Sequence, residues 1–287
     1  MRRTKGICTL EASQLARLPW LVHGFSTRVD ASRAEAAAPF NLGFTDADSR
    51  PAVAARRRRF AAALGAANWP VAAATQFHSD AIYVFNDAHV PSEPPRADGL
   101  IAQASGLLLT VQTADCVPIL LVDTRRRAIA AVHAGWRGTL ARIVQKALGK
   151  MRMNFGTRPA DIIAAMGPSI GPCCYEVGPE VAQAFAGQFD AAKEWFEGPF
   201  DRLSSGEEPN PLPWLNMMPP GHQPAPPRVQ LDLRAANRWQ LLDAGVSSAR
   251  IVVSPLCTAC RTDLLFSYRR EGPGTGRLMS AIGIRKK

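Results

Sequence analysis

The feature that most constrains the fold is a pair of apolar runs between residues 117 and 133. Val117 to Val122 and Ala128 to His133 consist almost entirely of apolar residues, and Arg125-Arg126-Arg127 lies between them. Short apolar runs that are separated by a polar turn predict two buried strands joined as a hairpin. Cys116 precedes the first run and His133 ends the second. Two chemically reactive side chains are therefore expected at the same buried structure.

Other segments carry similar signals along the whole length. Further strands are predicted at 21–26, 81–85, 107–111, 161–166, 250–254, 264–268 and 278–284, and helices at 51–64, 138–151, 178–189 and 233–244. This mixture of strands and helices predicts an α/β or α+β layered sandwich. Residues 197–228 are rich in proline and interrupt the pattern. They predict a long surface excursion inside one domain that spans residues 1–287.

The composition is that of a globular protein, with 47% hydrophobic and 20% charged residues in 287. A chain of this length can bury one sizeable core. No apolar run reaches the roughly 20 residues that a membrane-spanning helix needs. No secretory signal is evident at the start, so a cytoplasmic location without a membrane partner is expected.

The formal net charge of +10 raises the question of a nucleic-acid partner. Much of the excess lies in two blocks, Arg56 to Arg59 and Arg285 to Lys287. Neither block is accompanied by a nucleic-acid-binding motif with interleaved aromatic residues. We therefore expect no nucleic-acid partner, whereas the positive charge favours anionic substrates such as phosphate.

Six cysteines in a chain this long do not predict a disulfide framework. Cys173 and Cys174 are adjacent, and Cys257 and Cys260 form a C-x-x-C pair. The spacing of the first pair departs from that of the usual zinc ribbon. These four are interpreted as core or loop thiols, with a redox pair as the alternative.

Three reactive side chains are predicted to lie at strand ends, where open sheets place ligand sites. They are His78, Cys116 and His133. Two imidazoles and a thiolate suit tetrahedral zinc and leave its fourth position open for a reactant. The spacing alone does not establish a metal site. A metal-free pair of Cys116 as nucleophile and His133 as base stays an alternative, as does a structural cysteine beside unrelated histidines.

Several motifs resemble one known family. They are Gln76-Phe77-His78, Ala97-Asp98-Gly99-Leu100, Thr113 to Pro118, His133 to Gly138, Gly167 to Val177, Cys257-Thr258, Phe266 to Arg270 and Thr275-Gly276-Arg277. In this order they resemble the laccase-domain (YfiH-like, multicopper polyphenol oxidase-type) family of purine nucleoside phosphorylases. The proline-rich excursion looks longer than the family's usual segment.

The resemblance implies a single-domain, four-layer α/β/β/α sandwich of mixed sheets. It also implies a catalytic zinc site formed by His78, Cys116 and His133, with copper as a possible substitute. The implied reactions are phosphorolysis of adenosine, inosine and methylthioadenosine, and deamination of adenosine. The partners are then a nucleoside and phosphate, and the oligomeric state is left open.

For those reactions Arg57, Arg137, Ser169 and Arg269 are candidates for binding the anion or the ribose. Asn41 and Gln76 are candidates for binding substrate hydroxyls or for orienting a metal ligand. Asp115 is expected either to orient a histidine or to cap a turn, and Glu176 is a candidate proton-transfer group.

Three other functions stay open. One is a cytoplasmic peptidoglycan-precursor editing amidase or another Cys–His hydrolase. A second is a copper-dependent polyphenol oxidase, although four close copper ions need more than five scattered histidines. The third is a non-catalytic binding module.

Overall fold

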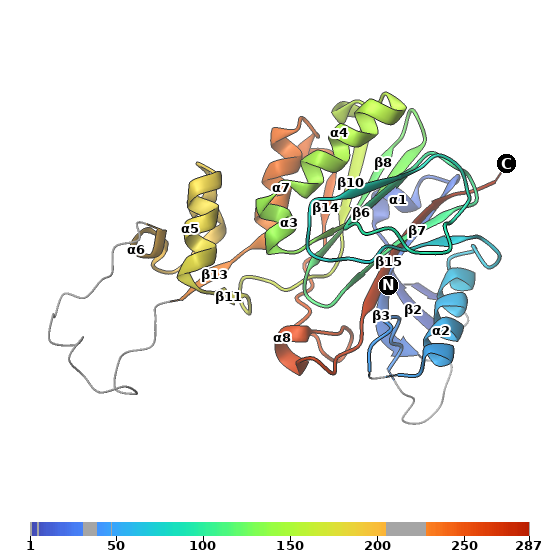
Figure 1. Ribbon diagram of the computed structural model, residues 1–287, viewed down its shortest axis with the longest axis horizontal. Coiled ribbons are helices and arrows are strands. Elements are labelled where there is room, and N and C mark those ends of the chain that lie inside the picture. The colour runs from blue at the N-terminus through green and yellow to red at the C-terminus, as the bar shows by residue number, and fades with distance from the viewer. Residues whose placement is uncertain (1, 5, 31–38, 47, 205–227, 287) are drawn as a thin grey trace, which may run out of the picture.

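The computed structural model describes residues 2–4, 6–30, 39–46, 48–204 and 228–286 (Figure 1). Two six-stranded sheets lie at its centre. Across the first sheet the order is β1 (Arg2–Thr4), β2 (Ile7–Leu10), β3 (Leu21–Asp30), β15 (Leu278–Ile284), β7 (Leu108–Thr113) and β4 (Val71–Ala72). Across the second it is β14 (Ile251–Val253), β10 (Ile162–Met166), β8 (Val117–Asp123), β9 (Ala128–Ala134), β6 (Gly99–Ala102) and β5 (Ile82–Phe85). Both sheets mix parallel and antiparallel pairs.

Helices cover the outer faces of both sheets (Figure 1). One side carries α2 (Arg50–Ala63), and the other carries α3 (Trp136–Leu140), α4 (Ile143–Phe155) and α7 (Leu233–Asp243). Helix α5 (Pro179–Gln188) lies further from the sheets and contacts α3 and α6. The shorter helices are α1 (Ser13–Ala16), α6 (Phe200–Ser204) and α8 (Tyr268–Glu271). A small third sheet contains β11 (Glu176–Val177), β13 (Val229–Leu231) and β12 (Phe196–Glu197). Within the described residues no helix is both long and apolar enough to cross a lipid bilayer.

The apolar core consists of layers on either side of β8. Ile119 and Leu121 pack with the residues of α4, α5 and α7, while Leu120 and Val122 pack with those of the first sheet. Successive strand residues point to opposite faces, so a strand that is covered on both faces needs a continuous apolar run. The first sheet packs its other face against α2. The predicted α/β/β/α sandwich is therefore confirmed.

The predicted hairpin is confirmed as β8 paired with β9. The pairing is antiparallel, with Val117 opposite Ala134 and Pro118 opposite His133. This register places Cys116, which precedes β8, at the same end of the hairpin as His133. The local sequence thus brings two of the three candidate ligands together.

Two predicted elements differ in the structure. The helix predicted at 138–151 is divided between α3 and α4, because Arg142 adopts a left-handed φ of 61° between them. The strand predicted at 264–268 is wrong. Leu265 and Phe266 are buried in a small cluster with Leu278, so their apolar character reflects loop packing rather than a sheet.

The excursion predicted at residues 197–228 falls only partly within the described residues. Residues 205–227 lie outside the described part of the chain, whereas 198–204 include α6. There Phe200 is buried and its ring stacks on that of Phe196 at a centroid distance of 4.6 Å. The start of the predicted excursion is therefore part of the packed structure.

Phe185→Ala is expected to lower the free energy of unfolding by about 3–5 kcal/mol. Phe185 is fully buried, and its ring contacts those of Phe189, Trp195 and Phe196. Urea denaturation would measure the loss. Met153→Ala is the control, because Met153 is 80% exposed on α4 and its removal should change stability by no more than about 0.5 kcal/mol. Equal losses in the two variants would contradict the assigned core.

Candidate functional site

His78, Cys116 and His133 converge although they come from three parts of the chain. His78 precedes β5, Cys116 lies between β7 and β8, and His133 is near the end of β9. Their possible ligand atoms all lie within 4.8 Å of one another. The two imidazole ring centroids are 5.0 Å apart, His133 is buried, and His78 is exposed. The cluster therefore has a buried side and an open side.

The carboxylate of Asp98, just before β6, holds this arrangement together. Its Oδ1 accepts a hydrogen bond from Nδ1 of His133 at 2.8 Å and from the backbone amide of His78 at 3.1 Å. Its Oδ2 accepts from the backbone amides of Phe77 and Ser79 and from the Ser79 hydroxyl. A carboxylate bonded to the far nitrogen of a metal-binding histidine fixes the orientation and tautomer of its ring.

The electrostatics favour charged forms inside this cluster. Burial alone would raise the pKa of Asp98, but hydrogen bonds from His133 and Ser79 hold that pKa well below its ordinary value. Burial alone would also raise the pKa of the Cys116 thiol, but His133 and then His78 outweigh it and lower that pKa. The pKa of His133 is raised in turn, against burial, by Cys116 and Asp98. Cys116 therefore has the thiolate character that a metal ligand or a nucleophile needs.

The cluster fits a metal ion. Nδ1 of His133 is occupied by Asp98, so Nε2, the ring atom on the side of Cys116, is the one that would coordinate a metal in place of its hydrogen bond to the thiolate. The backbone of Gly135 passes so close that a Cβ there would lie 3.0 Å from Cys116 Sγ and 3.1 Å from the His78 ring. The donor set of one sulfur and two nitrogens, and this close approach of the backbone, form a compact site that could hold a metal.

A cavity of about 740 Å³ opens at the cluster. Its lining includes His78, Cys116 and His133 together with three aromatic side chains and three arginines, namely Trp136, Tyr175, Tyr268, Arg137, Arg269 and Arg277. A volume of several hundred Å³ suits a small-molecule ligand. The His78–Cys116–His133 cluster is thus accessible from a space in which a substrate can lie.

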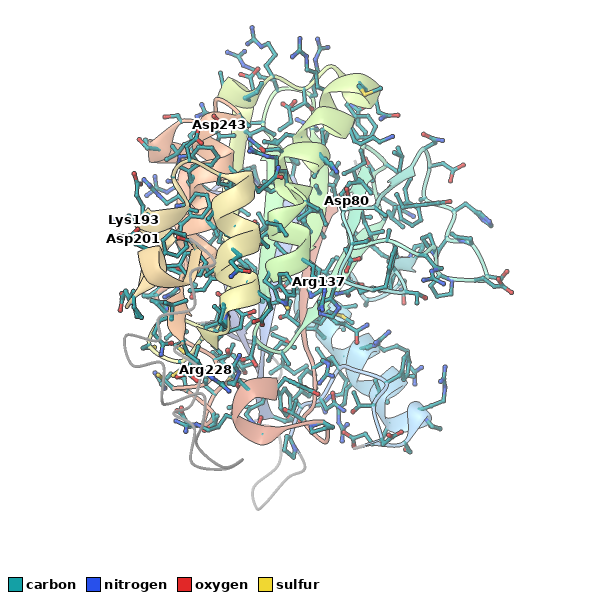
Figure 2. All side chains as sticks on the ribbon, turned by 60° about the vertical axis from the view of Figure 1, so that its left-hand side comes forward. Asp80, Arg137, Lys193, Asp201, Arg228 and Asp243 are labelled. Carbon is teal, nitrogen blue, oxygen red and sulfur yellow. The ribbon has the colours of Figure 1, made fainter. Side chains whose placement is uncertain are left out.

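The three arginines give the cavity a positive lining. Within the described residues, none of the three guanidinium groups forms a salt bridge with a carboxylate. Arg269 donates instead to the carbonyl of Glu176, and Arg277 donates to the carbonyls of Thr275 and Gly276. Arg137 lies in the first turn of α3 (Figure 2), with its guanidinium over the Trp136 ring at 4.3 Å. Such a lining attracts an anion.

The other candidate substrate residues lie at different places. Gln76 lines the cavity, but its amide exchanges two hydrogen bonds with the backbone of Gln112. Of the residues described here, the cavity lining does not include Asn41, Arg57 or Ser169. Asn41 is buried and its Oδ1 accepts from the backbone amide of Arg277. It thereby supports the loop that carries one of the three arginines.

Arg57 and Ser169 contact other parts of the protein rather than the cavity. The Arg57 guanidinium donates to the carbonyl of Leu42 and lies 4.1 Å from the centroid of the Phe44 ring. Burial, with a smaller effect of Arg50, lowers the pKa of Arg57 to about 10. Ser169 is fully buried, and its carbonyl accepts from the amide of Thr258.

Asp115 and Glu176 support the cavity wall. Among the described residues, Asp115 forms no hydrogen bond with His78 or His133. Its carboxylate accepts from the Thr258 hydroxyl at 2.6 Å and from the backbone amide of Arg269 at 2.7 Å. The Glu176 carboxylate accepts from Arg228. Asp115 therefore anchors the arginine loop, and the role of orienting a histidine belongs to Asp98.

His23 and His89 are separate from the cluster. Nε2 of buried His23 accepts from the amide of Ala12 at 3.0 Å, and the amide of His89 bonds to Asp87. His222 lies outside the described residues. Sequence reasoning did not assign roles to Asp98, Arg277 or Tyr175, although all three stand in the motifs that it quoted.

The chain is similar to several known proteins. A curated relative from Deinococcus radiodurans named purine nucleoside phosphorylase is 36% identical over 98% of this chain and 95% of its own. A relative from an unknown prokaryotic organism named adenosine deaminase RL5 is 40% identical over 64% of this chain. The match covers only about three fifths of the length of that relative and of others.

The crystal structure of YlmD from Geobacillus stearothermophilus superimposes with a TM-score of 0.78 and 31% identity. The superposition covers 100% of this chain and 98% of that one. The sequence model of the family described as multi-copper polyphenol oxidoreductase laccase matches residues 22–285. The chain therefore belongs to this laccase-domain family, as its motifs predicted.

Proposed function

We propose that the protein is a zinc-dependent purine nucleoside phosphorylase for adenosine, inosine and methylthioadenosine, and that it also deaminates adenosine. The observation that carries the proposal is one cavity that contains both the His78–Cys116–His133 cluster and three guanidinium groups, which have no carboxylate partner among the described residues. The names of the relatives, purine nucleoside phosphorylase and adenosine deaminase, support the same chemistry.

Zinc is the proposed ion because a thiolate and two imidazoles are the nitrogen and sulfur ligands that it prefers. His78, Cys116 and His133 would hold it. When bound, such an ion acts as a Lewis acid toward an oxygen atom of a reactant. Asp98 keeps His133 in the orientation that coordination requires.

The three arginines are proposed to bind the phosphate that phosphorolysis consumes. In phosphorolysis an oxygen of phosphate attacks the anomeric carbon of the ribose, and the bond to the purine nitrogen breaks. Arg137, Arg269 and Arg277 are proposed to bind the phosphate and hold it beside the ribose, because guanidinium groups match the geometry of phosphate oxygens.

The aromatic residues are proposed to bind the purine. Trp136 and Tyr268 line the cavity, and aromatic rings of this kind can pack against a purine. Burial is the main cause that raises the pKa of Tyr175, so its hydroxyl stays protonated and can donate a hydrogen bond to the departing base. In deamination, water takes the place of phosphate as the oxygen nucleophile. It attacks the purine carbon that carries the amino group, the bond from that carbon to the amino nitrogen breaks, and ammonia leaves.

A Cys–His hydrolase, including an amidase for peptidoglycan precursors, is the second candidate. Asp98, His133 and Cys116 form a chain of contacts in which a carboxylate orients an imidazole beside a thiol. This is the arrangement of a nucleophile with its base and orienting group. A polyphenol oxidase has less support. Of the two potential metal-binding clusters in the described residues, one contains only cysteines and the other contains two histidines, which is too few for several close copper ions.

Metal-loaded protein is expected to release free base from adenosine, inosine or methylthioadenosine only when phosphate is present, and to convert adenosine to inosine without phosphate. Chromatography of the purine products would measure both reactions. Cys116→Ala should lower both rates by at least about 100-fold. It removes a proposed metal ligand, and loss of a residue that only hydrogen-bonds to a ligand already costs about 10- to 100-fold. Near-normal turnover by this variant would refute the role of the thiolate. Hydrolysis of an amide substrate, with no reaction of nucleosides, would favour the second candidate.

Asp98→Asn is expected to weaken zinc binding by about 10- to 100-fold. The amide would place an NH₂ group where the carboxylate now only accepts hydrogen bonds. Competition with a chromophoric chelator would measure the affinity. Asp123→Asn is the matched control, since Asp123 is also fully buried but caps the turn at the far end of β8. An equal effect in both variants would mean that general destabilisation, not histidine orientation, is responsible.

Arg137→Ala and Arg269→Ala are each expected to raise the KM for phosphate by about 10- to 100-fold, because a hydrogen bond between charged groups contributes about 1.5–3 kcal/mol. The KM for the nucleoside should change less. Initial rates at varied phosphate would measure the effect. Arg158→Ala is the control, since Arg158 pairs with Asp161 and is not in the cavity lining. An unchanged KM for phosphate in both cavity variants would remove the proposed anion site.

A further inference from the structure

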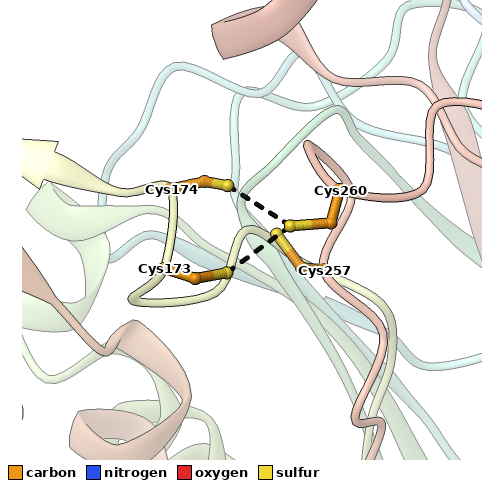
Figure 3. A group of neighbouring side chains, drawn as sticks. All are labelled: Cys173, Cys174, Cys257 and Cys260. Carbon is orange, nitrogen blue, oxygen red and sulfur yellow. Dashed lines mark hydrogen bonds between the residues drawn. The ribbon is translucent and has the colours of Figure 1, made fainter.

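Four cysteines meet at a place outside the His–Cys–His cluster (Figure 3). Cys173 and Cys174 lie in the loop that follows β10, and Cys257 and Cys260 lie in the loop that follows β14. Their sulfur atoms all lie within 4.8 Å of one another. Sγ of Cys260 is 3.6 Å from that of Cys173 and 3.4 Å from that of Cys174.

These distances suit a shared metal ion. In tetrahedral coordination with Zn–S bonds of about 2.3 Å, neighbouring sulfur atoms are roughly 3.8 Å apart. A disulfide needs a separation of about 2.05 Å. We propose that Cys173, Cys174, Cys257 and Cys260 bind a second zinc ion in a closed, structural site. This site is independent of the nucleoside chemistry proposed above.

Each pair of thiols is positioned by a backbone turn. The amides of Cys174 and Tyr175 both donate to the carbonyl of Gly171, which folds the first loop back on itself. The amide of Arg261 donates to the carbonyl of Cys257, so Cys257 and Cys260 stand three residues apart on one helical turn. Residues at this spacing lie on the same side of a turn. The adjacent pair and the C-x-x-C pair can therefore face one ion.

The two loops are joined before any metal is considered. Ser169 and Cys257 form a parallel bridge, and the amide of Thr258 donates to the carbonyl of Ser169 at 3.0 Å. The amide of Gly171 donates to Sγ of Cys257 at 3.2 Å. An N–H group directed at sulfur favours the thiolate, which is the form that binds zinc.

The surroundings offer close packing and positive charge. A Cβ on Gly171 would lie 3.3 Å from Sγ of Cys173 and 2.9 Å from Nη2 of Arg234, so the backbone fits there because residue 171 is glycine. The guanidinium of Arg270 donates to the carbonyl of Ala259, between the two cysteines of the second loop. Arg270 would offset part of the net negative charge of a zinc ion with four thiolates, whereas Arg234 also pairs with Asp232.

The proposed site lies directly behind the wall of the cavity. Ile170 and Tyr175 flank Cys173 and Cys174 in the chain, and both line the cavity. Asp115 contacts both loops, since its carbonyl accepts from the amide of Ile170 and its carboxylate from the hydroxyl of Thr258. A metal ion held by the four thiolates would therefore fix the wall on which Tyr175 stands.

The test uses the full chain with Cys116→Ala, in which only the four-cysteine site keeps its complete ligand set. After replacement of zinc by Co²⁺, this protein is expected to show the absorption of tetrahedral cobalt with four thiolate ligands. Elemental analysis should find one zinc per chain in Cys116→Ala, one in Cys260→Ser and none in the double variant. Cys8→Ser is the matched control, because Cys8 is buried outside both clusters, and it should keep both ions.

Two results would overturn the proposal. One is the absence of zinc from Cys116→Ala protein by elemental analysis. This result would overturn the proposal whether a thiol titration in non-reducing denaturant finds the four cysteines free or joined in disulfides. The other is a cobalt spectrum that requires fewer than four thiolates. Because both measurements use a variant with all four cysteines intact, a folding defect of Cys260→Ser does not affect them. Absence of nucleoside turnover in the metal-loaded protein with Cys116 intact, together with the four-thiolate spectrum in Cys116→Ala, would count against the proposed reaction alone.

Discussion

The buried carboxylate of Asp98 joins the strand that carries His133 to the loop that carries His78. Its two oxygens accept from the His133 ring, from three successive backbone amides and from one hydroxyl. Burying a carboxylate costs free energy unless its oxygens are hydrogen-bonded, so these contacts together offset the cost of burying Asp98. The positions of the two imidazoles therefore depend on the docking of the 76–79 segment against β6 and β9.

The inner part of the site contains interacting charged groups, and its outer part contains exposed arginines. Asp98, His133 and Cys116 interact at the end of a buried hairpin, where water is scarce and electrostatic attraction is strong. Arg137 and Arg269 lie further out and are exposed, where an anion from solution can reach them. A rigid inner cluster beside an open cationic lining suits a reaction between a bound group and a diffusing anion.

Relatives named for phosphorolysis and for deamination share this chain's family. Both reactions bring an oxygen nucleophile to a purine nucleoside, and they differ in whether that oxygen belongs to phosphate or to water. In the proposed function the arginine lining favours phosphate, and the inner cluster serves both nucleophiles. The proposed four-thiolate site would contact neither the nucleoside nor phosphate. It would stabilise the part of the cavity wall that contains Tyr175.

The sequence by itself determined the buried hairpin, most of the helices and strands, and the meeting of Cys116 with His133, because these follow from local apolar periodicity and from one tight turn. The family motifs added His78. Only the tertiary structure decided that Asp98 rather than Asp115 orients a histidine, that Arg277 enters the cavity, and that two distant cysteine pairs meet. Such contacts depend on which strands become neighbours in a sheet and which loops then meet at its edge. No local pattern encodes that outcome, since the partners are brought together by the packing of the whole core.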